Sequence, residues 1–354
     1  MRGQGGLSTI DSDDRGLRVD IDIILNEFTS PQEAAELGLL AESYGVRGIW
    51  SSNYGWSRDP FFTLSLLAAQ SSRIRLGPMA ISPWELHPLK MANLLYSLNE
   101  LSGGRAMIMV GGGGAVLQAM GMKRDRMIRA GRECLEILRG VSAQRSLNYT
   151  GEIFKVYGHR LEWATQAPPL LYFGSNYPQS RAMSAQLADG LITSDFCVPL
   201  MHEFVQGAHD DLQAANRSVS DFHISNFWAW HIKEDAEASY REARRELILR
   251  GYLGEKYFSP FLEPEEVSLM RDHFQDFMNA FTRQTDVIEN VPPALVKKMI
   301  DNVCFVGGLD AIDSAVESLK GFAAAGLTET ALRVHDEPER AIRLIGERVI
   351  PHLR

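Results

Sequence analysis

Cysteine is scarce in this sequence of 354 residues, which contains only Cys134, Cys197 and Cys304. Three widely separated cysteines form neither a disulfide framework nor the spacing of a zinc site, so we expect free thiols and no bound metal. No apolar run approaches the roughly 18 residues of a membrane-spanning helix, and the first residues hold no apolar signal core. We therefore expect a cytoplasmic protein without membrane contact, with a flexible tail over residues 1–16.

Positive charge is also in short supply. Lys and Arg total 36 against 45 Asp and Glu, which gives a net charge of -9. This balance argues against nucleic acid or an anionic membrane as the main partner. The apolar fraction of 45% and the charged fraction of 23% are those of an ordinary globular protein, which excludes intrinsic disorder. A small molecule is the partner that these numbers leave open.

Three nucleotide-binding and catalytic motifs are missing. The glycine cluster at residues 111–114 is not followed by Gly-Lys-Ser/Thr, so it is not a phosphate-binding Walker loop. It also lacks the GxGxxG spacing and the later acidic residue of a dinucleotide-binding turn. No Ser or Cys lies in a GxSxG elbow, so a covalent hydrolase is not expected. The glycines indicate either a close approach of backbone to a ligand or a turn without one.

Short β-rich runs alternate with amphipathic helical stretches along most of the chain. Consecutive βα units need right-handed parallel crossovers, and eight of them close into a barrel. The sequence therefore predicts an α/β fold, a (β/α)8 TIM barrel, as a single domain over residues 17–354. We expect a hairpin at 148–162 and a helical insertion at 250–302, before the last barrel unit. The expected strands are 17–25, 47–51, 74–81, 105–110, 169–173, 190–194, 222–232 and 331–334.

Polar and small residues follow the expected strands, at the end of the barrel where active sites lie. This set is poor in metal ligands and nucleophiles, and its amides, glycines and aromatic rings favour a pocket for a large planar ligand with a phosphate. Around residues 174–180, helix-start amides and serine hydroxyls could hold that phosphate, or could simply cap the helix. The strand-end residues are Asn26, Glu27, Ser52, Asn53, Tyr54, Ser82, Ser175, Asn176, Ser194, Asp195, Trp230, His231 and His335.

The first strand alternates between two faces. Its apolar face should pack against helices, which leaves Asp22 and Asn26 in the barrel interior. A carboxylate in that position is either paired structurally or a functional acid with a raised pKa.

Four segments together resemble the luciferase-like flavin and deazaflavin oxidoreductases. They are SRDPFFTLSLLAAQSSRIRLGPMAISPWELHP, LNELSGGRAMIMVGGGG, PPLLYFGSNYPQSRAMSAQLADGLI and VGGLDAIDSAVESLKGFAAAGLTETALRV. The first segment is most similar to the branch that uses coenzyme F420, which includes methylene-tetrahydromethanopterin reductases. The resemblance implies a ring at the barrel mouth and a non-prolyl cis peptide bond behind it. It places the ring edge near Met79, Ala80, Ile81 and Ser82, and the phosphate near Gly174, Ser175, Asn176 and Tyr177.

The chain departs from that pattern where relatives carry acid–base groups. Ser52-Asn53 stands in place of Asp-His, and Gly114 in place of a Glu of sugar-phosphate dehydrogenases. Because alcohol oxidation needs a base for the hydroxyl proton, that activity is disfavoured. The Glu that methylene reductases place in the first strand falls on Ile24, which also disfavours a strict methylene reductase. Met79 replaces a small residue and could restrict the ring.

Our leading hypothesis is an F420-dependent oxidoreductase that transfers hydride between the deazaflavin and a small organic substrate. Alternatives are an FMN-dependent monooxygenase using O2 with a separate reductase, an NADH-dependent methylene-folate reductase without flavin, and a non-catalytic binding subunit. Helices beside the second and third strands would form a homodimer. The expected roles are orientation by Asn53 and Ser82, backbone contact at Gly112 and Gly113, phosphate binding by Ser175 and Asn176, and proton donation by Asp22.

Overall fold

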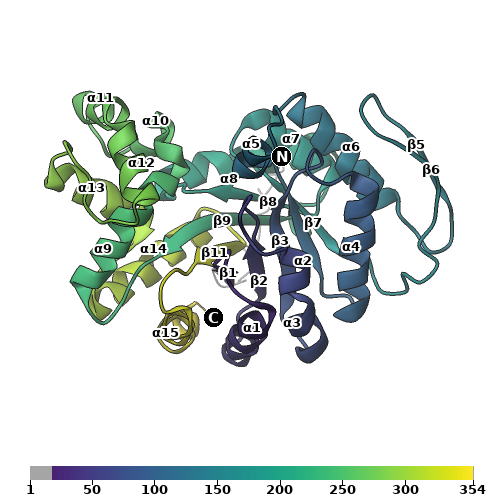
Figure 1. Ribbon diagram of the computed structural model, residues 1–354, viewed down its shortest axis with the longest axis horizontal. Coiled ribbons are helices and arrows are strands. Elements are labelled where there is room, and N and C mark those ends of the chain that lie inside the picture. The colour runs from purple at the N-terminus through teal and green to yellow at the C-terminus, as the bar shows by residue number, and fades with distance from the viewer. Residues whose placement is uncertain (1–17, 354) are drawn as a thin grey trace, which may run out of the picture.

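Eight parallel strands close into a barrel in the computed structural model, which describes residues 18–353 (Figure 1). The sheet is continuous from β9 through β11, β1, β2, β3, β4 and β7 to β8, and β8 pairs with β9 to close it. The predicted (β/α)8 barrel is thus confirmed. The barrel strands are β1 Asp20–Leu25, β2 Gly48–Ser52, β3 Arg75–Ile81, β4 Met107–Val110, β7 Leu170–Gly174, β8 Gly190–Ser194, β9 His223–Trp230 and β11 Glu329–Arg333.

Helices surround the barrel, and several begin with capping signals. For α1, Ser30 and Glu33 form a reciprocal capping box, Pro31 occupies the first turn, and Gly45 ends the helix at a φ of 81°. The surrounding helices are α1 Pro31–Tyr44, α2 Pro60–Thr63, α3 Ser65–Gln70, α4 Pro88–Leu101, α5 Gly114–Ala119, α6 Met127–Gly140, α7 Pro178–Leu187, α8 Val198–Ala214, α9 Ala236–Glu246, α14 Ile312–Ala324 and α15 Pro338–Leu344. The chain ends in a π-helical turn η4, Ile345–Val349, and a 3-10 turn η5, Ile350–His352.

Two local features differ from the sequence prediction. The helical pattern of residues 60–70 predicts one continuous helix, but the structure interrupts it at Leu64, between α2 and α3. Leu64 is fully buried, so the apolar pattern continues through the interruption and gives no sign of it. A two-residue strand, β10 Cys304–Phe305, pairs with the end of β9 at Ala229 and Trp230. Two residues carry no periodic signal, so this strand escaped prediction.

The barrel interior and the space between strands and helices are packed separately. As predicted, Ile21, Ile23 and Leu25 of β1 belong to the outer cluster, which the helices cover. The Asp22 side chain points inward, where it accepts a hydrogen bond from Trp50 Nε1 at 2.8 Å. The interior cluster is made of Ile24, Trp50, Met79, Met107, Tyr172, Ile192 and Ala331.

Two segments extend away from the barrel on opposite sides of Figure 1. The predicted hairpin is formed by β5 Leu147–Thr150 and β6 Lys155–His159, and its turn donates three backbone N–H bonds to buried Glu133. Between α9 and β10 lie η1 Leu247–Leu249, η2 Gly251–Leu253, α10 Glu255–Phe258, α11 Pro264–Asp272, α12 Phe274–Thr282 and α13 Pro293–Val303. Within residues 18–353, no helix has both the length and the apolar character needed to cross a membrane.

Candidate active site

The end of β3 carries a bulge at the mouth of the barrel. The Met79–Ala80 peptide bond is cis, as the resemblance implied, and the pairing of β3 with β4 shifts register between Met79 and Ile81. Asn53, directly after β2, holds this bulge from the side. Its backbone N–H donates to Met79 O at 2.9 Å, and its side-chain Nδ2 donates to Ala80 O at 2.9 Å.

The glycine cluster after β4 packs directly against that bulge. A Cβ atom on Gly111 would lie 2.7 Å from Ala80 Cβ, and one on Gly113 would lie 2.8 Å from Ser82 Cβ. Gly113 also has a φ of 77°, which side chains rarely tolerate. Gly112 differs because it is exposed, and a Cβ there would meet no atom closer than 3.9 Å. The bulge and Gly112 thus form a continuous strip, in which Gly112 is exposed, Ala80 is half-buried and Met79, Ile81 and Ser82 are buried.

Glu85 is a residue of this site that the strand-end pattern did not predict. Asn53 Nδ2 donates a second hydrogen bond to Glu85 Oε1 at 2.6 Å. The other carboxyl oxygen, Oε2, is buried and has no hydrogen-bond partner among the described residues. Burial raises the pKa of Glu85 above its ordinary value, against the effect of the Asn53 hydrogen bond. Glu85 lies four positions after the end of β3, outside the residues that directly follow the barrel strands.

The segment from Gly174 to Ser180 follows β7 and leads into α7. Ser175 Oγ lies 2.9 Å from Ser180 Oγ. Asn176 accepts a hydrogen bond from Thr193 Oγ1 at 2.9 Å and donates one to Tyr257 Oη at 2.7 Å. These side chains already have protein partners, so a phosphate here would depend on the backbone N–H groups of the first turn of α7, which has no side-chain cap.

Lys256 of α10 approaches the same segment. Its Nζ donates to Asn176 O at 2.8 Å and lies 3.8 Å from the centre of the Tyr177 ring, which is 63% exposed. Burial lowers the pKa of Lys256 to about 8. This lysine adds a positive charge to the region where the sequence analysis expected a phosphate, and its distance along the chain hid it from that analysis.

Asp22 lies at the other end of the barrel. It pairs in register with Gly48, the first residue of β2, whereas Asn53 follows the last. Five residues of strand separate those levels by about 16 Å. Asp22 is fully buried and forms an ion pair with Arg47. Burial raises the pKa of Asp22 above its ordinary value, while Arg47 opposes this. The structure thus assigns Asp22 the paired arrangement and separates it from the other candidates.

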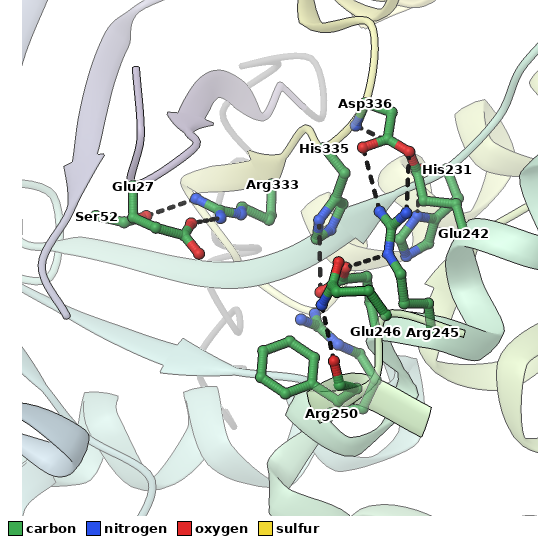
Figure 2. A network of polar contacts seen from close by, with 12 residues as sticks. Glu27, Ser52, His231, Glu242, Arg245, Glu246, Arg250, Arg333, His335 and Asp336 are labelled. Atoms are coloured by element: carbon green, nitrogen blue, oxygen red, sulfur yellow. Dashed lines mark hydrogen bonds and ion pairs between the residues drawn. The ribbon is translucent and has the colours of Figure 1, made fainter. Parts of the chain in front are cut away.

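A third group of polar residues lines the mouth beside β1, β9 and β11 (Figure 2). Arg333 Nη2 lies 2.6 Å from Glu27 Oε2, and its Nη1 donates to Ser52 Oγ at 2.6 Å. Nearby, the rings of His231 and His335 stack at 4.6 Å, and His231 Nδ1 lies 2.7 Å from Glu242. These contacts join the loops that follow β1, β2, β9 and β11.

Two buried histidines in this group each have one ring nitrogen without a hydrogen-bond partner among the described residues. These atoms are His231 Nε2 and His335 Nε2, both of which are buried. Burial, followed by the neighbouring His231 and arginines, lowers the pKa of His335 well below its ordinary value. Arg250 nearby pairs with Asp195 at 2.9 Å. In the described part of the chain, no three His, Cys, Asp or Glu side chains gather closely enough to hold a metal ion.

Polar side chains and a glycine cluster at the carboxyl ends of the strands of a (β/α)8 barrel place this protein in the class of barrels whose active sites lie at that end. The family model described as luciferase-like monooxygenase matches residues 16–329, and the chain belongs to that family. It is 25% identical over 320 residues to a 5,10-methylenetetrahydromethanopterin reductase from Archaeoglobus fulgidus. That alignment covers 89% of this chain and 94% of the relative.

Solved structures share the fold at lower identity. The coenzyme F420-dependent tetrahydromethanopterin reductase from Methanopyrus kandleri matches with a TM-score of 0.76 and 21% identity, covering 95% of this chain and 100% of that one. The oxygenating constituent of 3,6-diketocamphane monooxygenase from Pseudomonas putida, in complex with FMN, matches with a TM-score of 0.63 and 17% identity, covering 94% and 98%. Relatives of both kinds are redox enzymes, and this chain is an enzyme of that family.

Proposed function

We propose that this enzyme is an F420-dependent oxidoreductase that transfers hydride between the deazaflavin and an electrophilic carbon of a small organic substrate. The observation that carries the proposal is the strip formed by the bulge at Met79–Ser82 and the exposed Gly112, which Asn53 holds from the side. A flat ring could lie over Gly112, because no side chain projects from that residue. The fold shared with the coenzyme F420-dependent tetrahydromethanopterin reductase from Methanopyrus kandleri supports the deazaflavin.

When bound, the reduced coenzyme would supply a hydride from C5 of its ring. The residues of this chain would orient that ring and exclude water from it. Asn53 would hold the backbone carbonyl of Ala80 in place, and Ser82, which is fully buried, would hold the turn that follows. Lys256 and the first N–H groups of α7 would bind the phosphate tail.

The direction of the reaction follows from the groups that are missing. Ser52 and Asn53 stand where a base would remove a hydroxyl proton, and Ser52 Oγ already accepts a hydrogen bond from Arg333. Alcohol oxidation requires that base. Because burial favours the protonated form of nearby Glu85, which then acts as an acid and not as a base, we propose that the enzyme works as a reductase of C=C, C=N or C=O groups.

FMN-dependent oxygenation is the second candidate, because a monooxygenase in complex with FMN shares the fold. The two candidates require different coenzymes. Fluorescence titration of the purified protein with reduced coenzyme F420, and separately with reduced FMN and NADH, discriminates between them. Saturable quenching by coenzyme F420 is expected, and a flat titration with it would refute the proposal. Oxygen consumption that depends on reduced FMN would favour the monooxygenase.

Substitution of Gly112 tests where the ring lies. Gly112→Val adds a side chain at the exposed residue of the strip, where its Cβ meets no protein atom closer than 3.9 Å. We expect an unchanged melting temperature and a large loss of affinity for coenzyme F420. Ala214→Val is the matched control, because it enlarges an exposed side chain at the last residue of α8, shortly before β9 begins. Equal affinities in both variants would place the ring elsewhere.

A further inference from the structure

We propose that Glu85 is the proton donor of this active site and that Asn53 positions it. The inference rests on the proposed function, since the proton is needed only if a substrate accepts hydride at the barrel mouth. Asn53 Nδ2 bridges Ala80 O at 2.9 Å and Glu85 Oε1 at 2.6 Å. One amide thus fixes the acid relative to the strip on which the ring would lie.

The free oxygen of Glu85 distinguishes it from an ordinary surface carboxylate. Glu85 is half-buried, and its Oε2 atom is buried without a hydrogen-bond partner among the described residues. A buried carboxylate oxygen without a partner is costly, whereas a protonated oxygen can donate to a bound substrate. Glu85 Oε1 is therefore held by Asn53, and Glu85 Oε2 is left to donate a proton.

Other buried or half-buried carboxyl groups that follow barrel strands are neutralised by cations. Glu27, after β1, is paired with Arg333 at 2.6 Å. Asp195, after β8, is paired with Arg250 at 2.9 Å and accepts the Gly251 N–H at 2.9 Å. An arginine partner stabilises the ionised carboxylate and so opposes protonation. Among these carboxyl groups, Glu85 is the one left to carry a proton.

The groups that face Glu85 come from three segments. Asn53, after β2, donates to it, and the Ser82 backbone of its own turn also stabilises its charged form. Asp59, before α2, adds a second negative charge. Burial and Asp59 both favour the neutral acid, and neither of the two hydrogen-bonding groups carries a positive charge. In the described residues no Lys, Arg or His side chain counteracts them.

For a substrate with a C=N or C=O group, the hydride comes from the coenzyme and the proton comes from Glu85. The C5–H bond of the reduced coenzyme breaks with both electrons, and a new C–H bond forms at the substrate carbon. The π electron pair moves to the nitrogen or oxygen, which takes the proton from Glu85 Oε2. The substrate is reduced and the coenzyme is oxidised, releasing its ring N–H proton to solvent. Glu85 is left as a carboxylate, which the Asn53 hydrogen bond stabilises until solvent returns a proton.

The first test measures the protonation state of Glu85 without any coenzyme. Carbon-13-labelled glutamate gives a carboxyl resonance for Glu85, identified by its absence in Glu85→Gln. We expect this resonance to titrate above the ordinary range of a glutamate carboxyl group. Asn53→Ala should move the titration further upward, because it removes a hydrogen bond to the charged form. Titration of Glu85 at or below that ordinary range would overturn the proposal.

The second test measures turnover of reduced coenzyme F420, with 1-pyrroline as the C=N probe and cyclohexanone as the C=O probe. Glu85→Gln should lower kcat by about 10²–10⁴-fold and abolish its decline at high pH, whereas Glu85→Asp should retain part of the rate. Glu36→Gln is the control and should match the wild type. An unchanged pH profile in Glu85→Gln would overturn the proposal, and the titration of the resonance decides alone if neither probe reacts. Failure of the wild type to bind coenzyme F420 would refute the proposed function instead.

Discussion

The two ends of the barrel differ in how their buried ionisable groups are paired. At the amino-terminal end, Arg47 joins Asp22, Glu329 and Tyr172, and His223 Nδ1 lies 2.7 Å from Glu329. We call these five residues the amino-terminal cluster, in which each charged group has an opposite partner. At the carboxyl-terminal end, several buried atoms of ionisable side chains have no hydrogen-bond partner among the described residues: Glu85 Oε2, His231 Nε2, His335 Nε2 and Arg250 Nε.

This difference indicates that the amino-terminal end of the barrel contributes to stability, whereas the carboxyl-terminal end is available for ligand binding and chemistry. A fully paired buried cluster holds the chain in one arrangement, because removal of any member leaves an uncompensated charge. Groups without partners at the mouth are available for a coenzyme or substrate, which would supply the missing hydrogen bonds. Asp22 and Glu85 illustrate the contrast, since burial raises the pKa of both carboxyl groups but only Asp22 has an arginine beside it.

The largest effect should come from removing the cation of the amino-terminal cluster. Arg47→Met leaves Asp22 and Glu329 buried without a cation, so we expect the free energy of unfolding to fall by about 3–5 kcal/mol. Urea denaturation measures this loss. Below its melting temperature the variant should still bind coenzyme F420 normally, because the cluster lies at the far end of the barrel.

Arg18→Met is the control for that substitution. It removes an ion pair to Asp20 that is exposed on both sides and so should change stability by less than about 1 kcal/mol. Adding Asp22→Asn and Glu329→Gln to Arg47→Met should recover part of the lost stability, because the uncompensated charges disappear. No recovery in the triple variant would mean that packing, not charge, explains the loss.

An intermediate effect is expected where the glycine cluster contacts the β3 bulge. Gly113→Ala places a Cβ 2.6 Å from Leu117 and 2.8 Å from Ser82, at a φ of 77°. Gly103→Ala has a similar φ of 66° but nothing within 4 Å. Gly113→Ala should therefore destabilise the protein by about 1–3 kcal/mol more than Gly103→Ala, by overpacking. Equal losses of stability in the two variants, measured by thermal denaturation, would show that Gly113 does not pack closely against Leu117 and Ser82.

The smallest effect concerns the pH dependence of stability at His335. Its pKa lies well below the ordinary value in the folded protein, because burial disfavours the charged ring. Below a pH of about 6.5 the unfolded chain takes up a proton that the folded chain does not. The free energy of unfolding therefore decreases as the pH is lowered, by up to about 1.4 kcal/mol per pH unit. His335→Asn should flatten this slope, measured by urea denaturation between pH 7 and about pH 5.5.

The exposed His352 provides the comparison for His335. His352→Asn should leave the slope unchanged, because its side chain is exposed to solvent in the folded protein. A slope that stays the same in His335→Asn would indicate that His335 is charged inside the folded protein.

Much of the fold could be predicted from the chain itself. The alternation of strand and helix patterns located all eight barrel strands within a few residues. The interruption at Leu64 and the two residues of β10 could not be predicted, because both preserve the apolar pattern around them.

The candidate site was predicted less completely. The cis bond at Met79–Ala80 and the place of Asn53 beside it followed from a family resemblance and from the strand order. The role of Asn176 as a link to Tyr257 did not, because its partner lies 81 residues away. Glu85 was missed for a similar reason: its partner Asn53 is 32 residues distant and belongs to a neighbouring strand end.

The sequence alone determined the number and order of the strand–helix units, the glycines after β4 and the shortage of metal ligands and paired cysteines, since these depend on composition and local periodicity. The tertiary structure decided which distant side chains meet. Barrel closure brings Glu329 to Arg47 at one end and Glu85 to Asn53 at the other. Whether a carboxyl group meets a cation or an amide depends on strand register and depth of burial, which no local pattern records.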